Sequence, residues 1–95
     1  MKEKVLRTKI VKSLNNYSGY WVVNVATMYG QGGLPDIVGC YAGVFYGLEV
    51  KLPGKEHTLT ERQAYCLKKI RRAGGKAMMV TSVDEAMTFV FGSPP

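Results

Sequence analysis

Residues that build zinc sites and disulfide frameworks are scarce in this sequence. It contains two cysteines, Cys40 and Cys66, and a single histidine, His57. The cysteines fall in a predicted strand and a predicted helix, without the spacing that is typical of metal ligands. We therefore expect neither a zinc site nor a disulfide, and we predict two buried free thiols in a reducing cytoplasm.

Long apolar runs are lacking as well. No stretch of about twenty consecutive apolar residues is present, so we predict no membrane span. The chain begins Met1-Lys-Glu-Lys4 and continues with an amphipathic pattern rather than an apolar core, so no signal peptide is expected. Internal repeats and low-complexity tracts are also missing. We predict one globular domain over residues 1–95, cytoplasmic and without a membrane partner.

Acidic residues are few. The chain has 7 Asp and Glu against 13 Lys and Arg, which gives a formal net charge of +6 at pH 7. A small basic domain favours a polyanionic partner, although charge alone predicts binding and says nothing of chemistry. With 46% hydrophobic residues, the chain can bury a modest core.

Helical and strand patterns alternate along the chain. We expect, in order, a helix over 3–15, a strand over 20–25, two strands within 36–51, a helix from a capping box at Thr58 and Glu61 to about Arg72, a strand over 76–81 and a short helix capped by Ser82. A crossover through the second helix would return the last strand parallel to its neighbour. The prediction is an α/β fold with a central mixed sheet flanked by helices.

Two of the few acidic residues flank a predicted hairpin. Asp36 and Glu49 enclose residues 37–48, an apolar and aromatic run interrupted by Ala42-Gly43. If Ala42-Gly43 is a two-residue turn, the register that it fixes places Asp36 opposite Glu49. Side chains alternate along a strand, so Lys51 lies on the same face as Glu49.

This arrangement predicts a cation site. Directly opposed side chains in a hairpin lie about 5 Å apart, and like charges there destabilise the pair. A hard divalent cation that bridges Asp36 and Glu49 would remove the repulsion. The alternative is that Asp36 is only a turn residue after Pro35, while Glu49 and Lys51 are solvated positions on an exposed strand face.

The same residues carry a family resemblance. Pro35-Asp36 followed by Glu49-Val50-Lys51 resembles the core motif of the PD-(D/E)XK nucleases. Gly33-Leu-Pro-Asp-Ile37 and Leu48-Glu-Val-Lys51, with Gln63 downstream, are similar to the virus-type replication-repair nuclease (VRR-NUC) domain, from about Glu3 to about Glu85. The resemblance implies the PD-(D/E)XK fold and a metal-dependent endonuclease. Its stand-alone members resolve four-way (Holliday) junctions in DNA as homodimers.

The resemblance also implies a metal site. Asp36 and Glu49 would bind Mg²⁺ or Mn²⁺, helped by the carbonyl of Val50 and by Glu3, directly or through water. A bound ion lowers the pKa of its water and neutralises charge on the phosphate. Glu3 has an alternative role, because a carboxylate at a helix N-terminus favours the helix dipole without any metal.

Two further residues receive catalytic roles from the resemblance. Lys51 would orient or deprotonate the attacking water and stabilise the transition state. Gln63 would position water or phosphate from the second long helix. The alternative for Gln63 is an ordinary, partly exposed side chain.

Several groups are candidate contacts to DNA phosphates. The glycine-rich loop can present backbone amides, although it can also be a plain flexible connection. The polar segment after the hairpin and the basic side chains of the second long helix are candidates too, with solvated side chains as the alternative. The full set is Gly30, Gln31, Gly32, Gly33, Lys55, His57, Arg62 and Lys69.

Two other functions compete with the junction resolvase. One is a basic DNA-binding module in which the acidic pair is purely structural. The other is a nuclease that acts on other branched or duplex DNA, including a sequence-specific restriction-type enzyme.

Overall fold

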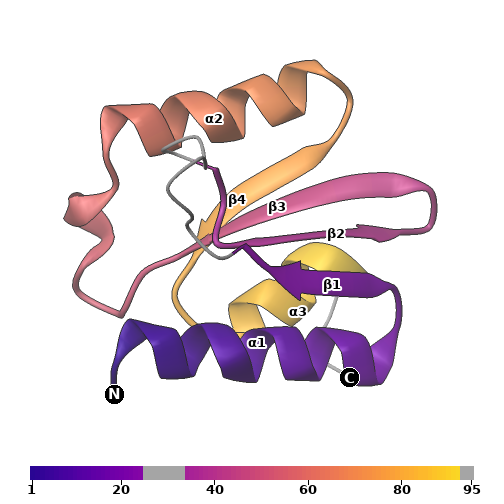
Figure 1. Cartoon of the computed structure of the whole chain (residues 1–95), viewed down its shortest axis with the longest axis horizontal. Helices are drawn as coiled ribbons and strands as arrows, with labels where there is room; N and C mark the ends of the chain where they lie inside the picture. Colours follow the sequence, from indigo (N-terminus) through magenta and orange to yellow (C-terminus); the bar gives the residue numbers. More distant parts are fainter. Residues whose placement is uncertain (25–33, 93–95) are drawn as a thin grey trace.

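A four-stranded sheet with helices on both faces forms the protein, in a computed structural model that describes residues 1–24 and 34–92 (Figure 1). The elements are α1 (Glu3–Tyr17), β1 (Tyr20–Val23), β2 (Ile37–Tyr41), β3 (Val44–Val50), the 3₁₀ turn η1 (Glu56–Thr58), α2 (Glu61–Arg72), β4 (Lys76–Val80) and α3 (Val83–Phe91). The predicted α/β class and the predicted order of helices and strands are confirmed.

The sheet is mixed, as predicted. Its strand order is β1-β2-β3-β4, with β1–β2 and β2–β3 antiparallel and β3–β4 parallel. Helix α2 is the crossover between the two parallel strands. The central strands β2 and β3 are therefore hydrogen-bonded to a neighbouring strand on both sides. Strand β3 contains Glu49, one of the two predicted metal ligands.

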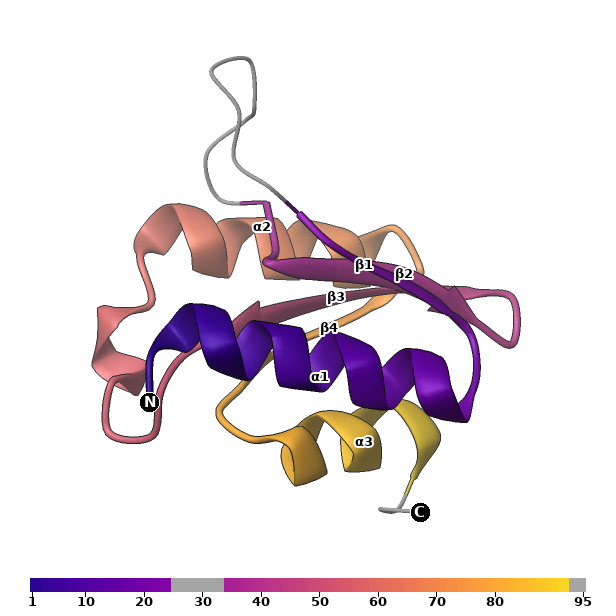
Figure 2. The ribbon, with the colours of Figure 1, turned by 60° about the horizontal axis from the view of Figure 1, so that its bottom comes forward.

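Helices α1 and α3 cover one face of the sheet and α2 covers the other (Figure 2). Alternation along β3 directs Tyr46, Leu48 and Val50 into the core on the side of α1 and α3. The helices contribute residues at helical spacing, namely Leu6, Ile10, Leu14, Ala86, Met87 and Val90. The alternate residues of β3, which include Glu49, therefore point to the opposite face of the sheet, which α2 covers.

The hairpin turn fixes the register that brings the acidic pair together. Ala42 and Gly43 both have positive φ, 53° and 78°, as the favoured two-residue hairpin turns require. Ile37 pairs with Leu48 and Tyr41 with Val44. Continuing this register by one residue sets Asp36 against Glu49, as predicted.

Several boundaries differ from the predictions. Helix α1 continues to Tyr17, since Asn15 does not end it but binds both backbone groups of Trp21. Strand β1 ends at Val23. The cap of α2 is Thr60, with Gln63 completing the capping box, so the prediction of a box at Thr58 and Glu61 is wrong. Thr58 instead closes η1, where its hydroxyl donates to the Lys55 carbonyl.

The cysteines also differ in part from the prediction. Both are free thiols, as expected, but Cys40 is exposed and Cys66 is partly buried. The predicted burial of Cys40 is wrong because its side chain points to the face of the sheet opposite the main core. Within residues 1–24 and 34–92, no helix is long and apolar enough to cross a membrane.

Candidate active site

Asp36 is held at the entry to β2 by contacts on both sides. Its carbonyl accepts a hydrogen bond from the Asn24 amide at 2.7 Å. Its Oδ2 accepts one from the Val50 amide at 2.8 Å. The carboxylate of Asp36 is thereby fixed beside the end of β3.

Glu49 is the buried member of the pair. Only 1% of the residue is exposed, and its Oε1 faces the Gln63 amide, whose Nε2 donates to it at 3.4 Å. No group in the described part of the chain donates to Glu49 Oε2. An ionised Glu49 would therefore bury one bare carboxylate oxygen, which is unfavourable without a cation.

The surroundings of Glu49 favour its neutral form. Its pKa is raised from its ordinary value of 4.5 to about 9, and burial is the largest cause. Asp36 contributes too, because its carboxyl can accept a hydrogen bond from protonated Glu49 and its charge opposes ionisation of Glu49, and the charge of Glu3 adds further. Lys51 acts in the opposite direction, so its ammonium lies close enough to favour the carboxylate.

Lys51 is buried too, at 7% exposure, directly after β3. Its amide donates to the Val80 carbonyl, so the backbone at this point is tied to β4. The alternative of solvated Glu49 and Lys51 on an exposed strand face is therefore wrong. Helix α2 covers that face, and the largely buried Lys51 lies close enough for its charge to act on the buried carboxyl of Glu49.

Gln63 has two contacts that act together. Its Oε1 accepts from the Thr60 amide at 2.9 Å and completes the capping box of α2. This bond orients the side-chain amide so that Nε2 points to Glu49. Gln63 is partly exposed, as the second alternative has it, and it also reaches the acidic pair while it caps the helix. Its predicted role in positioning water or phosphate stays a prediction.

Glu3 begins α1 on the same side of the molecule. It is partly buried in the first turn, where a negative charge suits the helix dipole, and it is close enough to raise the pKa of Glu49. Both predicted roles of Glu3 are compatible with this position. Direct ligation by Glu3 and by the Val50 carbonyl stays a prediction.

Arg7 is a site residue that sequence reasoning missed. Its Nη1 donates to Asp36 Oδ1 at 3.4 Å in the ion pair that joins α1 to β2. Arg7 follows Glu3 by one helical turn, so a helix that turns Glu3 toward the site turns Arg7 the same way. The spacing of Glu3 and Arg7 could therefore have identified Arg7 as a candidate site residue.

The donors suit a hard cation rather than zinc. Asp36 and Glu49 offer carboxylate oxygens, and Glu49 Oε2 is buried without a partner in the described residues. Oxygen ligands are typical of Mg²⁺ and Mn²⁺. Among residues 1–24 and 34–92, no three acidic, cysteine or histidine side chains gather closely enough to hold a metal ion alone. Backbone oxygens or water would have to complete the coordination.

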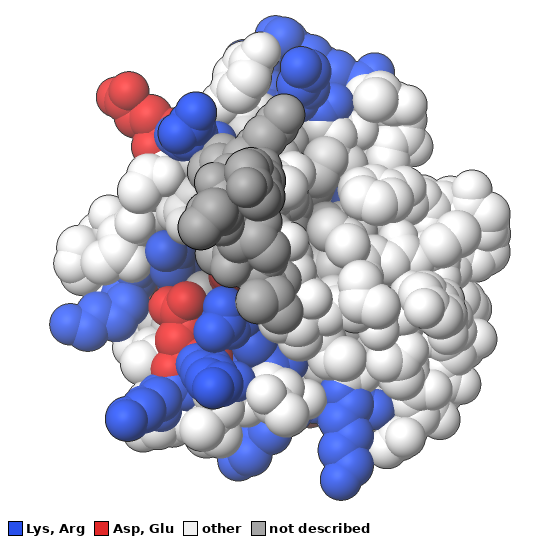
Figure 3. All heavy atoms as spheres, viewed as in Figure 1, with Lys and Arg blue, Asp and Glu red and all other residues white. Residues whose placement is uncertain are grey.

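The predicted DNA contacts are only partly located. Gly30, Gln31, Gly32 and Gly33 lie outside the described residues. Lys55, His57, Arg62 and Lys69 are all exposed, on the segment around η1 and on α2. Figure 3 shows Lys and Arg atoms gathered on the side of α2 and the start of α1, whereas the side of the β2–β3 hairpin is almost uncharged.

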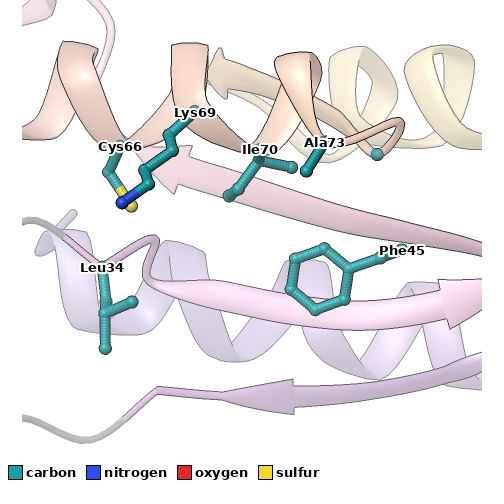
Figure 4. A pocket seen from close by; sticks show the side chains of 7 residues that line it. Leu34, Phe45, Cys66, Lys69, Ile70 and Ala73 are labelled. Carbon is teal, nitrogen blue, oxygen red and sulfur yellow. The ribbon is translucent and has the colours of Figure 1, made fainter.

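An apolar groove of about 410 Å³ lies between α2 and the sheet, next to the acidic pair. Figure 4 shows its lining, with the Lys69 amine directed toward Cys66 at one end. The residues are Leu34, Phe45, Cys66, Lys69, Ile70, Ala73 and Gly75. Burial raises the pKa of the Cys66 thiol, and the charge of Glu49 raises it further, which places this end of the groove near Glu49.

Comparison with known proteins does not assign a family. No family model, no curated protein and no solved structure matches the chain significantly. Support for the candidate site therefore comes from the arrangement of its side chains. Five side chains from four segments of the chain meet at one end of the sheet, namely Asp36, Glu49, Lys51, Gln63 and Arg7, with Glu3 beside them.

Proposed function

We propose that the protein is a metal-dependent endonuclease that hydrolyses phosphodiester bonds in DNA. The observation that carries the proposal is that the partly buried Asp36 lies against the buried Glu49, with Lys51 directly after the same strand. Two carboxyls and an ammonium concentrated at the end of a sheet are unfavourable for stability alone. Such a cluster is typical of a catalytic centre.

The fold is compatible with the PD-(D/E)XK core, to which we assign the chain. A helix, an antiparallel three-stranded meander, a crossover helix and a parallel fourth strand follow one another in the described residues. Asp36 begins the second strand and Glu49 lies near the end of the third. These positions support the resemblance to the VRR-NUC domain.

The side chains have distinct roles in this proposal. Asp36 and Glu49 would hold Mg²⁺ or Mn²⁺, which when bound supplies Lewis acidity and an activated water. Lys51 stabilises negative charge on the phosphate and helps to orient or deprotonate the attacking water. Gln63 is fixed by its bond to the helix cap, so its Nε2 can position Glu49 or a water with little loss of side-chain freedom.

The proposed substrate is branched DNA, in particular a four-way junction cut by a homodimer. Two symmetric cuts need two active sites, and one 95-residue domain has one such cluster in its described residues. The positive charge on the side of α2 suits the phosphates that converge at a junction. The preference for junctions rests on the family resemblance.

A cleavage assay tests the proposal. Purified protein is incubated with a labelled four-way junction, a flap and a linear duplex, with Mg²⁺, with Mn²⁺ or with chelator. We expect paired, metal-dependent nicks in the junction. Lys51→Met should abolish them, because it keeps the buried aliphatic stem and removes the ammonium.

The second candidate function is a DNA-binding module with a structural acidic site. The ion pair between Arg7 and Asp36 favours it, because it gives Asp36 a partner without any metal. Tight junction binding with no cutting by any metal would support the module and contradict the nuclease. Equal cutting of all three substrates would keep the nuclease and contradict the junction preference.

A further inference from the structure

Arg7 contacts the acidic pair through only part of its guanidinium. Of its five N–H groups, one reaches Asp36 Oδ1, at a long 3.4 Å. Its Nε is buried and has no partner in the described residues. The side chain of Arg7 is 26% exposed and that of Asp36 17%, so the pair lies at an opening to solvent.

The atom that Arg7 contacts is the one that a cation needs. Oδ2 of Asp36 already accepts a short bond from the Val50 amide. Oδ1 has only the long contact to Arg7, so it is the oxygen of Asp36 that is more open to a further ligand. A divalent cation bound at Oδ1 would repel the guanidinium and compete with it for the same lone pairs.

We propose that Arg7 is an exchangeable counter-ion of the site. Arg7 neutralises Asp36 until a divalent cation takes Oδ1, and the displaced guanidinium then binds a phosphate oxygen of the substrate. The second half of this proposal rests on the proposed nuclease function. The first half concerns only the free protein and the metal ion.

The chemistry of the guanidinium suits this exchange. A partly exposed ion pair at 3.4 Å contributes little stability, so its loss on metal binding is readily offset. A planar guanidinium keeps its charge at every physiological pH and binds phosphate through two parallel N–H groups. Because the Arg7 guanidinium starts beside Asp36, it would stay close to a phosphate that contacts the metal after it leaves Oδ1.

A titration of the free protein with Mn²⁺ tests the exchange. Calorimetry compares wild type with Arg7→Gln, Arg7→Lys and Lys9→Gln, the last of which removes one exposed positive charge from the same helix. We expect Arg7→Gln to bind Mn²⁺ about five-fold tighter or more, since a competing cation is gone. Lys9→Gln should stay within about two-fold of wild type, because an exposed charge is screened.

If Arg7 has only a structural role, Arg7→Gln should bind Mn²⁺ more weakly than wild type, not more tightly. If Arg7→Gln binds Mn²⁺ no tighter than Lys9→Gln, the exchange is overturned. Thermal unfolding of each variant in the absence of metal shows whether the substitution has disrupted the fold. Arg7→Lys, which keeps a cation at Asp36, should then bind Mn²⁺ as wild type does, and a gain in affinity equal to that of Arg7→Gln would also overturn the exchange.

Single-turnover cleavage at saturating Mn²⁺ tests the phosphate contact. We expect Arg7→Gln to cut at least about ten-fold more slowly than Lys9→Gln, because a phosphate ligand is missing although the metal binds better. Equal rates would overturn the phosphate contact. If wild type binds Mn²⁺ but cuts no DNA, the nuclease proposal fails, while the titration still decides the exchange.

Discussion

The carboxyl group of Glu49 lies where an ionised side chain is unfavourable. It is buried by α2, it faces Asp36, and one oxygen has no donor in the described part of the chain. The neutral form therefore dominates in the metal-free protein near neutral pH. This follows from burial first and from Asp36 second, with Lys51 opposing both.

The raised pKa of Glu49 predicts a pH-dependent stability. Between 4.5 and about 9, the folded protein holds a proton on Glu49 that the unfolded chain does not. The contribution of Glu49 is therefore full below pH 4.5 and is lost as the pH rises to about 9, at up to about 1.4 kcal/mol per pH unit. Glu49→Gln, which cannot ionise, should remove this loss.

Urea unfolding in chelator at pH 5, 7 and 8.5 measures the effect. We expect the stability of wild type to fall relative to that of Glu49→Gln as the pH rises. The same pH dependence in both proteins would contradict the raised pKa of Glu49.

At the scale of elements, the hairpin and α2 position the site from opposite directions. The hairpin sets Asp36 against Glu49, and α2 closes over Glu49 with Gln63 in its first turn. The side-chain amide of Gln63 makes both contacts, because its oxygen accepts from the Thr60 amide in the cap of α2 and its nitrogen donates to Glu49. The start of α2 therefore fixes the orientation of the Gln63 side chain in the site.

Gln63→Glu separates these two functions. A glutamate can still accept from the Thr60 amide, so the cap is kept, but it replaces the donor to Glu49 by an oxygen. We expect little change in melting temperature and a loss of cleavage of about ten-fold or more. Thr60→Ala, the control, should cost about 1 kcal/mol of stability and leave the rate nearly unchanged. Equal loss of rate in both variants would contradict a direct role for Gln63.

Much of this architecture could be predicted from sequence because it depends on short-range patterns. The turn at Ala42-Gly43 and the parity of a strand suffice to bring Asp36, Glu49 and Lys51 together. The one-turn spacing from Glu3 makes Arg7 a candidate, but its contact with Asp36 depends on how α1 packs on the sheet, which no local pattern contains. Thr58 and Thr60 both begin a plausible capping box, and the 3₁₀ turn that binds the Thr58 hydroxyl decides between them.

At the scale of the molecule, charge is distributed unevenly. The net charge is +6, and Lys and Arg gather on the side of α2 and the start of α1, near the candidate site (Figure 3). The exposed side chains of Arg62 and Lys69 belong to this side. This distribution would attract a polyanion toward the side of α2 and the start of α1 rather than toward the hairpin.

This distribution predicts strongly salt-dependent DNA binding. Arg62→Gln and Lys69→Gln should each weaken binding to all DNA sequences and reduce the slope of log affinity against log salt by about 1. Lys9→Gln is a control with the same change in net charge. Fluorescence anisotropy with a labelled junction in chelator measures the slopes. Unchanged slopes in both variants would mean that DNA binds elsewhere.

The central claim is that Asp36 and Glu49 hold a divalent cation, and calorimetric titration with Mn²⁺ tests it most directly. Asp36→Asn is the informative variant, because its side-chain oxygen can still accept from the Val50 amide while the charge is removed. We predict one Mn²⁺ site in wild type and none in folded Asp36→Asn. Equal binding by the two proteins, or no binding by wild type, would contradict the claim.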